Sequence, residues 1–205
     1  MDAAFLVTAF ATLFVVIDPP GLVPMFIALT QGMSAARRRE MALRGCLIAA
    51  GLLLVFGLAG EAVLGFIGIS MPAFRIAGGI LLFLTALDML FERRTQRREG
   101  QQADPDHDPS VFPLATPLIA GPGAIASMIL LVGESGPGWV GATAVIALML
   151  AMVAVTYLFL LASPALERAL GRTGTVVITR LLGMLLAALS VQFVIDGVRG
   201  TGLIG

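Results

Sequence analysis

The sequence predicts an all-α integral membrane protein whose six transmembrane helices form two inverted three-helix repeats. Composition is the first reason, because the 205 residues are 58% hydrophobic and only 13% charged, against about 25% charged residues in soluble domains. Length is the second, since six apolar blocks reach the roughly 17–25 residues that cross a bilayer as a helix. The third is that two blocks, the first and the fourth, are each broken near mid-membrane by proline and glycine.

The expected spans cover residues 3–31, 46–69, 74–91, 111–132, 139–162 and 176–198. Between them we expect tight turns and three longer polar connections, at 32–44, 92–110 and 163–175. Ser70 and Pro72 are placed to begin the third span, because serine caps helix starts and proline suits the first turn. Trp139 opens the fifth span, and tryptophan is typical of the membrane interface.

Arginines are concentrated in the connections that follow spans one, three and five. These connections hold Arg37, Arg38, Arg39, Arg44, Arg93, Arg94, Arg97, Arg98, Arg168 and Arg172. The opposite side has only Arg199 outside the spans. Because arginine-rich loops of membrane proteins remain in the cytoplasm, we expect the three connections to be cytoplasmic and both termini to be outside.

The two halves of the chain share landmarks at a nearly constant offset. The break at 17–21 aligns with 119–123, and an arginine-glycine run at 75–82 aligns with 180–187, at offsets of 102 and 105 residues. Three spans per repeat is an odd number, so the second half must enter the membrane upside down. Such inverted repeats with broken helices are typical of secondary transporters, which bind substrate near the midplane. The chain therefore divides into a first repeat, a cytoplasmic linker and a second, inverted repeat, at residues 1–91, 92–110 and 111–205.

Each break predicts the start of a half-helix inside the membrane. Asp18 before Pro19 is typical of an N-cap followed by a first helical turn, and Pro122 can start a second half-helix in the same way. Such starts expose backbone donors and attract a carboxylate. Asp18 either only caps its half-helix or also binds a substrate ammonium or a proton. The candidate substrate-binding residues are Asp18, Pro20, Gly21, Thr116, Gly121, Pro122, Gly123 and Ala124.

Four charged residues lie near the ends of the third and sixth spans. In the expected topology, Arg75 and Asp196 lie near the outer face, whereas Asp88 and Arg180 lie near the inner face. We hypothesise two ion pairs, Arg75 with Asp196 and Arg180 with Asp88, that act as alternating gates. The alternative is that the four side chains extend separately to the interfaces.

Several classes of function lack support in the sequence. The zero net charge does not favour nucleic acid. With one histidine, His107, and one cysteine, Cys46, the chain offers no metal site, and no cofactor motif is present. No hydrolase motif such as HExxH or GxSxG occurs, and Asp18, Asp88 and Asp196 are expected at three different depths. We therefore expect no enzyme.

The motifs at the breaks and the arginine-glycine runs resemble those of the MarC family of six-span membrane proteins, described as a neutral amino acid transporter family. The resemblance covers essentially the whole chain and rests on Asp18–Gly21 with Pro24, the run at 75–79, the long motif at 115–125 and the run at 179–183. It implies an inner-membrane protein and, as in some members, transport of glycine, alanine and similar amino acids. A distant similarity to LysE-type exporters would also permit export.

The leading hypothesis is a secondary transporter of small neutral amino acids: glycine, alanine and, as further candidates, serine and threonine. Proton coupling is part of this hypothesis, with Asp18 as the candidate partner. The alternatives are an exporter of another small metabolite, a drug exporter of the kind the name of the MarC family suggests, or a channel. The bilayer is the expected surrounding, and homo-oligomerisation is left open because small-residue spacings are too common to assign an interface.

Overall fold

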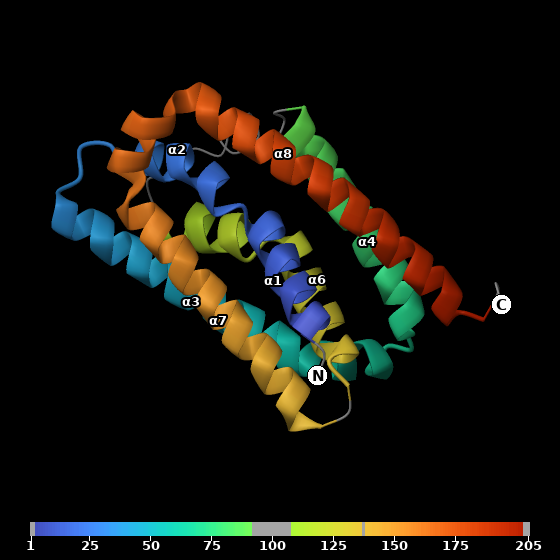
Figure 1. Cartoon of the computed structure of the whole chain (residues 1–205). Coiled ribbons are helices and arrows are strands. Elements are labelled where there is room, and N and C mark those ends of the chain that lie inside the picture. The colour runs from blue at the N-terminus through green and yellow to red at the C-terminus, as the bar shows by residue number, and fades with distance from the viewer. Residues whose placement is uncertain (1–2, 92–107, 137, 203–205) are drawn as a thin grey trace.

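The computed structural model describes residues 3–91, 108–136 and 138–202 (Figure 1). These residues form helices joined by short connections, and no strand occurs among them. Within this part of the chain, five helices are long and apolar enough to cross a membrane, and a bent helix pair makes a sixth span if it is counted as one. The all-helical membrane class predicted from the sequence is confirmed. Most of the expected linker at 92–110 lies outside the described residues.

The first span consists of two helices joined at a single residue. Helix α1 covers Ala3–Ile17 and helix α2 covers Pro19–Leu29. Asp18, between them, has a left-handed backbone with φ of 55° and ψ of 61°. Proline has no amide hydrogen and clashes with the preceding turn, so the two prolines at the start of α2 explain why α1 cannot simply continue.

Helix α3, at Ala35–Phe66, is longer than the sequence predicted. The predicted polar connection at 32–44 is wrong for most of its length, because the arginine run is helical. Ser34 accepts a hydrogen bond from the backbone of Arg37 at 3.4 Å and so caps the helix start. The 32 residues of α3 extend for about 48 Å, so the helix projects well beyond a hydrocarbon core of about 30 Å.

Helix α4, at Met71–Leu90, completes the first half. The predicted cap is confirmed, because the Ser70 hydroxyl accepts a hydrogen bond from the backbone of Ala73 at 3.4 Å. Pro72 lies in the first helical turn, as expected.

The second half begins with a bent pair of helices. Helix η1 covers Ser110–Ile119, and helix α6, at Pro122–Glu134, leaves it at an angle of 55°. Helix α7 then covers Trp139–Leu161, and helix α8, at Ser163–Gly200, is kinked at Gly171, where φ is 61°. The predicted polar connection at 163–175 is therefore wrong. It is mostly helical, because Pro164 suits a first helical turn, and two helical segments meet at Gly171, whose backbone is not helical.

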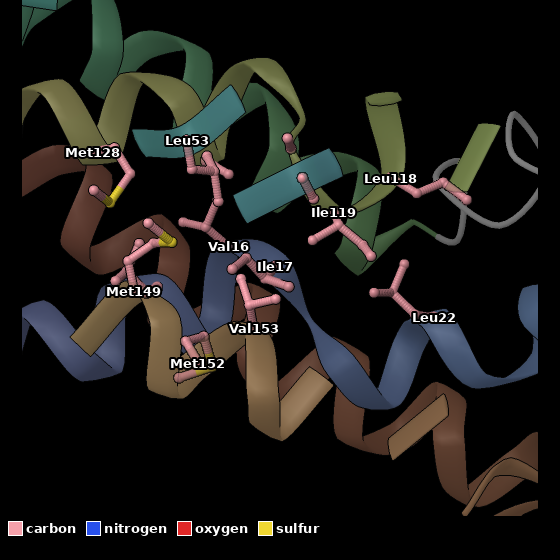
Figure 2. Packing of buried hydrophobic residues seen from close by; sticks show 14 of the residues in the cluster. Val16, Ile17, Leu22, Leu53, Leu118, Ile119, Met128, Met149, Met152 and Val153 are labelled. Carbon is pink, nitrogen blue, oxygen red and sulfur yellow. The ribbon is translucent and has the colours of Figure 1, made fainter. Parts of the chain in front are cut away.

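Helices α1 and α6 form the centre of the bundle (Figure 1). In the most hydrophobic window of each span, 61% of residues are buried in the α1–α2 span, but only 28% in α3, α4 and α8. Figure 2 shows side chains from the centre of the core, including Val16, Ile17, Leu22, Ile119 and Met128, packed in one cluster. The broken spans therefore lie inside, and the long continuous helices cover them.

Helices α4 and α8 pack against each other along their lengths in opposite directions. Gly79 of α4 is so close to α8 that an added Cβ would lie 2.8 Å from the Ser190 carbonyl oxygen. Further along, a Cβ on Gly183 of α8 would lie 3.3 Å from the Ala86 carbonyl oxygen of α4. The antiparallel arrangement fits two halves inserted in opposite senses, and the inverted repeat itself stays a prediction.

Candidate functional site

Asp18 forms the first break and is almost fully buried, at 1% exposed. Its amide donates to the Phe14 carbonyl at 2.9 Å, and its carbonyl accepts from the Leu22 amide at 3.2 Å, so backbone hydrogen bonding continues on both sides. Its carboxylate oxygen Oδ1 accepts from the Gly21 amide at 3.1 Å. The predicted N-cap is confirmed, and the role of Asp18 toward substrate stays a prediction.

Gly21 gives the Asp18 carboxylate the space it occupies. A Cβ added to Gly21 would overlap the carboxylate oxygen Oδ2. The neighbouring Pro20 is buried, so the first turn of α2 is covered from the lipid. Glycine at this position therefore allows a carboxylate to lie directly on a helix start.

The second break at Gly121 has a different kind of cap. Gly121 has an extended backbone and gives α6 no side-chain hydrogen bond, and Pro122 follows in the first turn. A Cβ on Gly121 would lie 2.5 Å from the Pro117 carbonyl oxygen. Gly123 and Ala124 are both buried. The first turn of α6 is therefore partly buried, with Pro122 exposed, and no side chain satisfies its backbone donors, which is the arrangement that attracts an anion.

The two breaks lie close to each other. A Cβ on Gly123 would lie 3.3 Å from Cγ1 of Val16, in the last turn of α1, and 3.2 Å from Cδ2 of Leu82 in α4. Figure 2 shows Ile17 and Leu22, on either side of the first break, in the same cluster as Ile119 from the second. The fold thus brings the two halves of the predicted substrate site together.

Asp18 and several apolar side chains around the breaks are buried in this conformation. Ile17, Leu22 and Ile119 are all 0% exposed, whereas Thr116 is exposed at the surface. Thr116 is therefore not part of the buried portion of the predicted site. Access to Asp18 from either side of the membrane requires these apolar side chains to move.

Two buried hydroxyls are further polar groups in this core. Thr12 of α1 and Ser127 of α6 are both 0% exposed. Neither hydroxyl oxygen has a hydrogen-bond partner among the described residues. Buried polar groups of this kind are rare without a partner, so both are candidates to contact a substrate or water. The sequence offered only a weak signal for Thr12, since hydroxyls in apolar helices more often bond to their own backbone.

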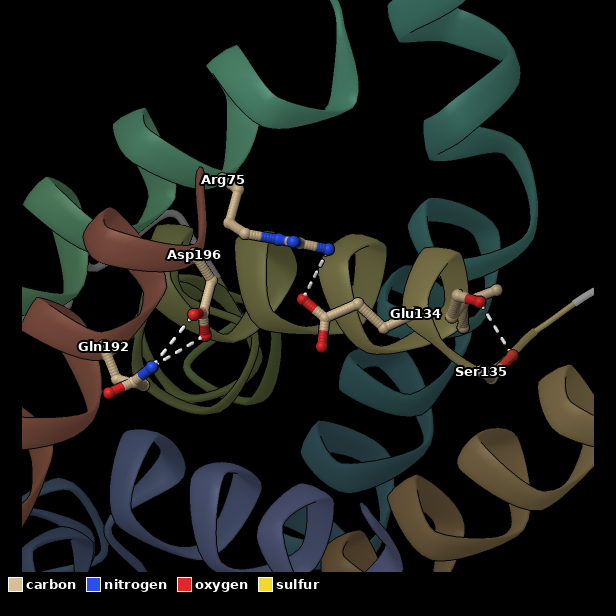
Figure 3. Close-up of polar contacts among 6 residues, drawn as sticks. Arg75, Glu134, Ser135, Gln192 and Asp196 are labelled. Atoms are coloured by element: carbon tan, nitrogen blue, oxygen red, sulfur yellow. Dashed lines mark hydrogen bonds and ion pairs between the residues drawn. The ribbon is translucent and has the colours of Figure 1, made fainter. Parts of the chain in front are cut away.

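The charged residues at one end of the bundle pair differently from the hypothesis. Arg75 forms an ion pair with Glu134 at 2.9 Å (Figure 3). Asp196 accepts hydrogen bonds from Gln192 at 2.9 and 3.0 Å and lies 3.7 Å from Arg199. The predicted direct pair between Arg75 and Asp196 is therefore wrong, because each finds a nearer partner, one at the end of α6 and the others on α8 itself.

The second hypothetical pair lies at the opposite end. Asp88 is near the end of α4 and Arg180 is in the first half of α8. Since these helices are antiparallel and Gly183 lies against Ala86, the two charged residues belong to the same end of the bundle. Their pairing and any gating by them stay predictions.

Two cavities lie at the arginine-rich end of the bundle. One, of about 490 Å³, is lined by residues that include Arg37, Glu40, Arg44 and Asp108. In it, Arg44 and Asp108 form an ion pair at 2.6 Å. A second, of about 350 Å³, lies between the ends of α2 and α7 and the starts of α3 and α8. Among the described residues, no group of three or more His, Cys, Asp or Glu side chains could hold a metal ion.

Comparison with known proteins decides the family. A family profile described as "MarC family integral membrane protein" matches residues 3–201. The chain belongs to the MarC family. This MarC protein is therefore an integral, multi-pass membrane protein, and the resemblance seen in its motifs is confirmed.

Its relatives extend across bacteria and archaea. It is 37% identical to the UPF0056 membrane protein MJ1677 of Methanocaldococcus jannaschii over 98% of each chain. It is 36% identical to the UPF0056 membrane protein YvbG of Bacillus subtilis, over 98% of this chain and 97% of that one. It is also 36% identical to the UPF0056 inner membrane protein YhgN of Escherichia coli K12, over 95% of this chain and 96% of that one. No solved structure matches the chain at a significant level.

Proposed function

We propose that this MarC protein is a secondary transporter of small neutral amino acids, with glycine and alanine as first candidates and serine and threonine next. The observation that carries the proposal is the meeting of two unlike helix starts in one buried cluster. One is capped by the carboxylate of Asp18, and the other, at Gly121, has no side-chain cap. A zwitterion matches this pair, since its carboxylate suits the uncapped start and its ammonium suits Asp18.

The packing favours a small substrate. A Cβ on Gly123 would meet Leu82 and Val16 at 3.2 and 3.3 Å, closer than ordinary contact, and Ala124 is 2% exposed. A bulky drug needs a larger cavity lined by more adaptable side chains. Proton coupling through Asp18 is part of the proposal, because a buried carboxylate in a membrane span is the usual carrier of a proton in transporters.

The same arrangement favours a carrier over an enzyme. Asp88 and Asp196 lie toward opposite ends of the antiparallel α4–α8 pair, and Asp18 lies in the interrupted first span. Carboxylates placed this far apart do not favour the close pair that an aspartic protease needs.

Uptake into proteoliposomes tests the proposal. Radiolabelled glycine and alanine are offered with and without an inward proton gradient, to wild type, Asp18→Asn and the matched control Asp108→Asn. We expect saturable uptake by wild type and the control, and loss of the gradient effect in Asp18→Asn. Leucine should not compete. Absence of uptake and counterflow with folded wild type would contradict the amino acid assignment and favour an exporter of another metabolite, whereas non-saturable flux would favour a channel.

The proposal also includes the orientation of the protein in an inner membrane. Both termini lie outside, and the arginine-rich end lies on the cytoplasmic side. The test places single cysteines on a Cys46→Ala background, at Thr201 near the end of α8 and at Ala35 at the start of α3. Both positions are exposed. A membrane-impermeant maleimide applied to intact cells should label Thr201→Cys and not Ala35→Cys. The opposite labelling would reverse the orientation.

A further inference from the structure

The cavity of about 350 Å³ combines a basic end with an apolar wall. Its lining includes two arginines, Arg38 and Arg39, and contains no carboxylate. The larger cavity beside it differs, because there Arg44 pairs with Asp108 at 2.6 Å and Glu40 adds a second acid. The smaller cavity therefore holds positive charge that its own lining does not neutralise.

Three donors converge on the basic end. Arg38 uses its Nε to donate to the Thr30 carbonyl at 3.3 Å, which holds the guanidinium at the end of α2. Arg39 is exposed one residue later. Ser163 lines the cavity and is 1% exposed, and within the described chain no hydrogen bond of its hydroxyl is found. Ser163 is also the first residue of α8, so the partial positive charge of a helix start is directed to the same place.

The wall of the cavity leads to the membrane-facing surface. Phe26 and Leu160 are each 1% exposed and form its buried side. Leu161, also in the lining, is 39% exposed, and Leu158, one turn earlier on α7, is 60% exposed. An apolar path thus continues from the basic end along α7, where a hydrocarbon chain can lie.

We propose that this cavity binds the phosphodiester headgroup of an anionic membrane lipid, with one acyl chain lying along Leu161. Phosphate oxygens accept hydrogen bonds from Arg38, Arg39 and the Ser163 hydroxyl, which completes a donor set that the protein leaves open. Arginine is well suited to such oxygens because its guanidinium donates in a fork. The bound lipid connects the end of α2 to the starts of α3 and α8.

The proposal is tested by thermal unfolding of the full-length protein in detergent micelles. Dioleoylphosphatidylglycerol, dioleoylphosphatidylcholine and inorganic phosphate are added in turn. We expect phosphatidylglycerol to raise the Tm saturably and the other two to have no effect. Since each arginine near an anionic surface is worth about 1 kcal/mol, or roughly fivefold in affinity, Arg38→Gln with Arg39→Gln should weaken the response roughly 25-fold. The matched double variant Arg37→Gln with Arg44→Gln, in the neighbouring cavity, should keep the wild-type response.

A second measurement covers the case in which loss of the Arg38 contact with Thr30 prevents folding. Arg39→Gln and Ser163→Ala leave that contact in place, and each should weaken the response severalfold. Wild type is also crosslinked with phosphatidylglycerol that carries a photoreactive group in its acyl chain, and the label should concentrate around Leu161. An equal loss in the control double variant, an equal Tm shift with inorganic phosphate, or label spread evenly over the exposed helices would overturn the proposal.

Discussion

The guanidinium of Arg75 lies 2.9 Å from the carboxylate of Glu134, and this ion pair connects the first turns of α4 to the last residue of α6. The two side chains are 21% and 26% exposed, and Nε of Arg75 is buried without a hydrogen-bond partner. Helix α6 begins at the second break, so the pair fixes the far end of the half-helix whose start is proposed to hold the substrate.

Breaking this pair should destabilise the protein. Glu134→Gln leaves a partly buried guanidinium beside a neutral amide, and we expect a loss of about 1–3 kcal/mol, between the values for exposed and buried pairs. The measurement is the free energy of unfolding in mixed detergent–SDS micelles. Asp196→Asn is the matched control, because Asp196 contacts Gln192 and Arg199 on its own helix and should lose less. A larger loss for the control would mean that Asp196 is the partner that matters to Arg75.

Gly21→Ala should damage the first break specifically. The new methyl group would overlap the Asp18 carboxylate, so the cap must move, at a cost of about 1–3 kcal/mol of unfolding free energy. Gly51→Ala is the matched control, since a Cβ on Gly51 of α3 has nothing within 4 Å and should stabilise the helix slightly. Both are measured by thermal unfolding, and an equal effect at the two glycines would show that the Asp18 cap tolerates displacement.

Gly79→Ala should separate α4 from α8. Its Cβ would lie 2.8 Å from the Ser190 carbonyl oxygen and 3.1 Å from the Val194 amide nitrogen, and backbone atoms cannot turn aside as a side chain can. We expect a loss of about 1–3 kcal/mol, with Gly51→Ala again as control. Disulfide trapping between cysteines on the two helices should become slower in the variant. Unchanged trapping together with unchanged stability would mean that the interface accommodates the added methyl group without separating the helices.

Asp108 should give the protein a component of stability that is lost in acid. Hydrogen bonds from the Ser110 hydroxyl at 2.6 Å and amide at 2.9 Å, followed by the charge of Arg44, hold the pKa of Asp108 below its ordinary 3.8. A carboxylate with a lowered folded pKa stabilises the protein fully above the unfolded value, and this stability disappears as the pH falls through the folded value. The difference in unfolding free energy between wild type and Asp108→Asn should therefore be constant near neutral pH and shrink below about pH 4. A difference that does not change in this range would exclude Asp108 as the titrating group.

Hydrophobic block length predicted the spans well, because the bilayer imposes it. The expected third span at 74–91 is Met71–Leu90 in the structure, and the expected fifth at 139–162 is Trp139–Leu161. Polarity was a poor guide to where helices end. The run that starts after Ser34 is charged and yet helical, and the signal that could have found it is the serine cap followed by good helix formers.

Pairing between distant side chains was the part that sequence could not determine. Asp196 and Glu134 were both available near the expected outer end, and only the packing of α4 against α6 selects Glu134 for Arg75. Ser163 was missed for a similar reason, because its burial depends on four helix ends meeting around one cavity. By contrast, the cap at Asp18 is a local interaction with Gly21, and local spacing was sufficient to predict it.

The close packing of α4 and α8 has a consequence for how the protein is made. The two helices come from different halves of the sequence, and their interface depends on Gly79 and Gly183 meeting the partner backbone. Synthesis proceeds from the N-terminus, so α4 enters the bilayer long before α8 leaves the ribosome. During that interval the face of α4 that carries Gly79 is in contact with lipid or with the insertion machinery. Assembly of the bundle is therefore completed only by its last helix, and truncation before α8 should leave the preceding helices inserted but α4 without its final packing.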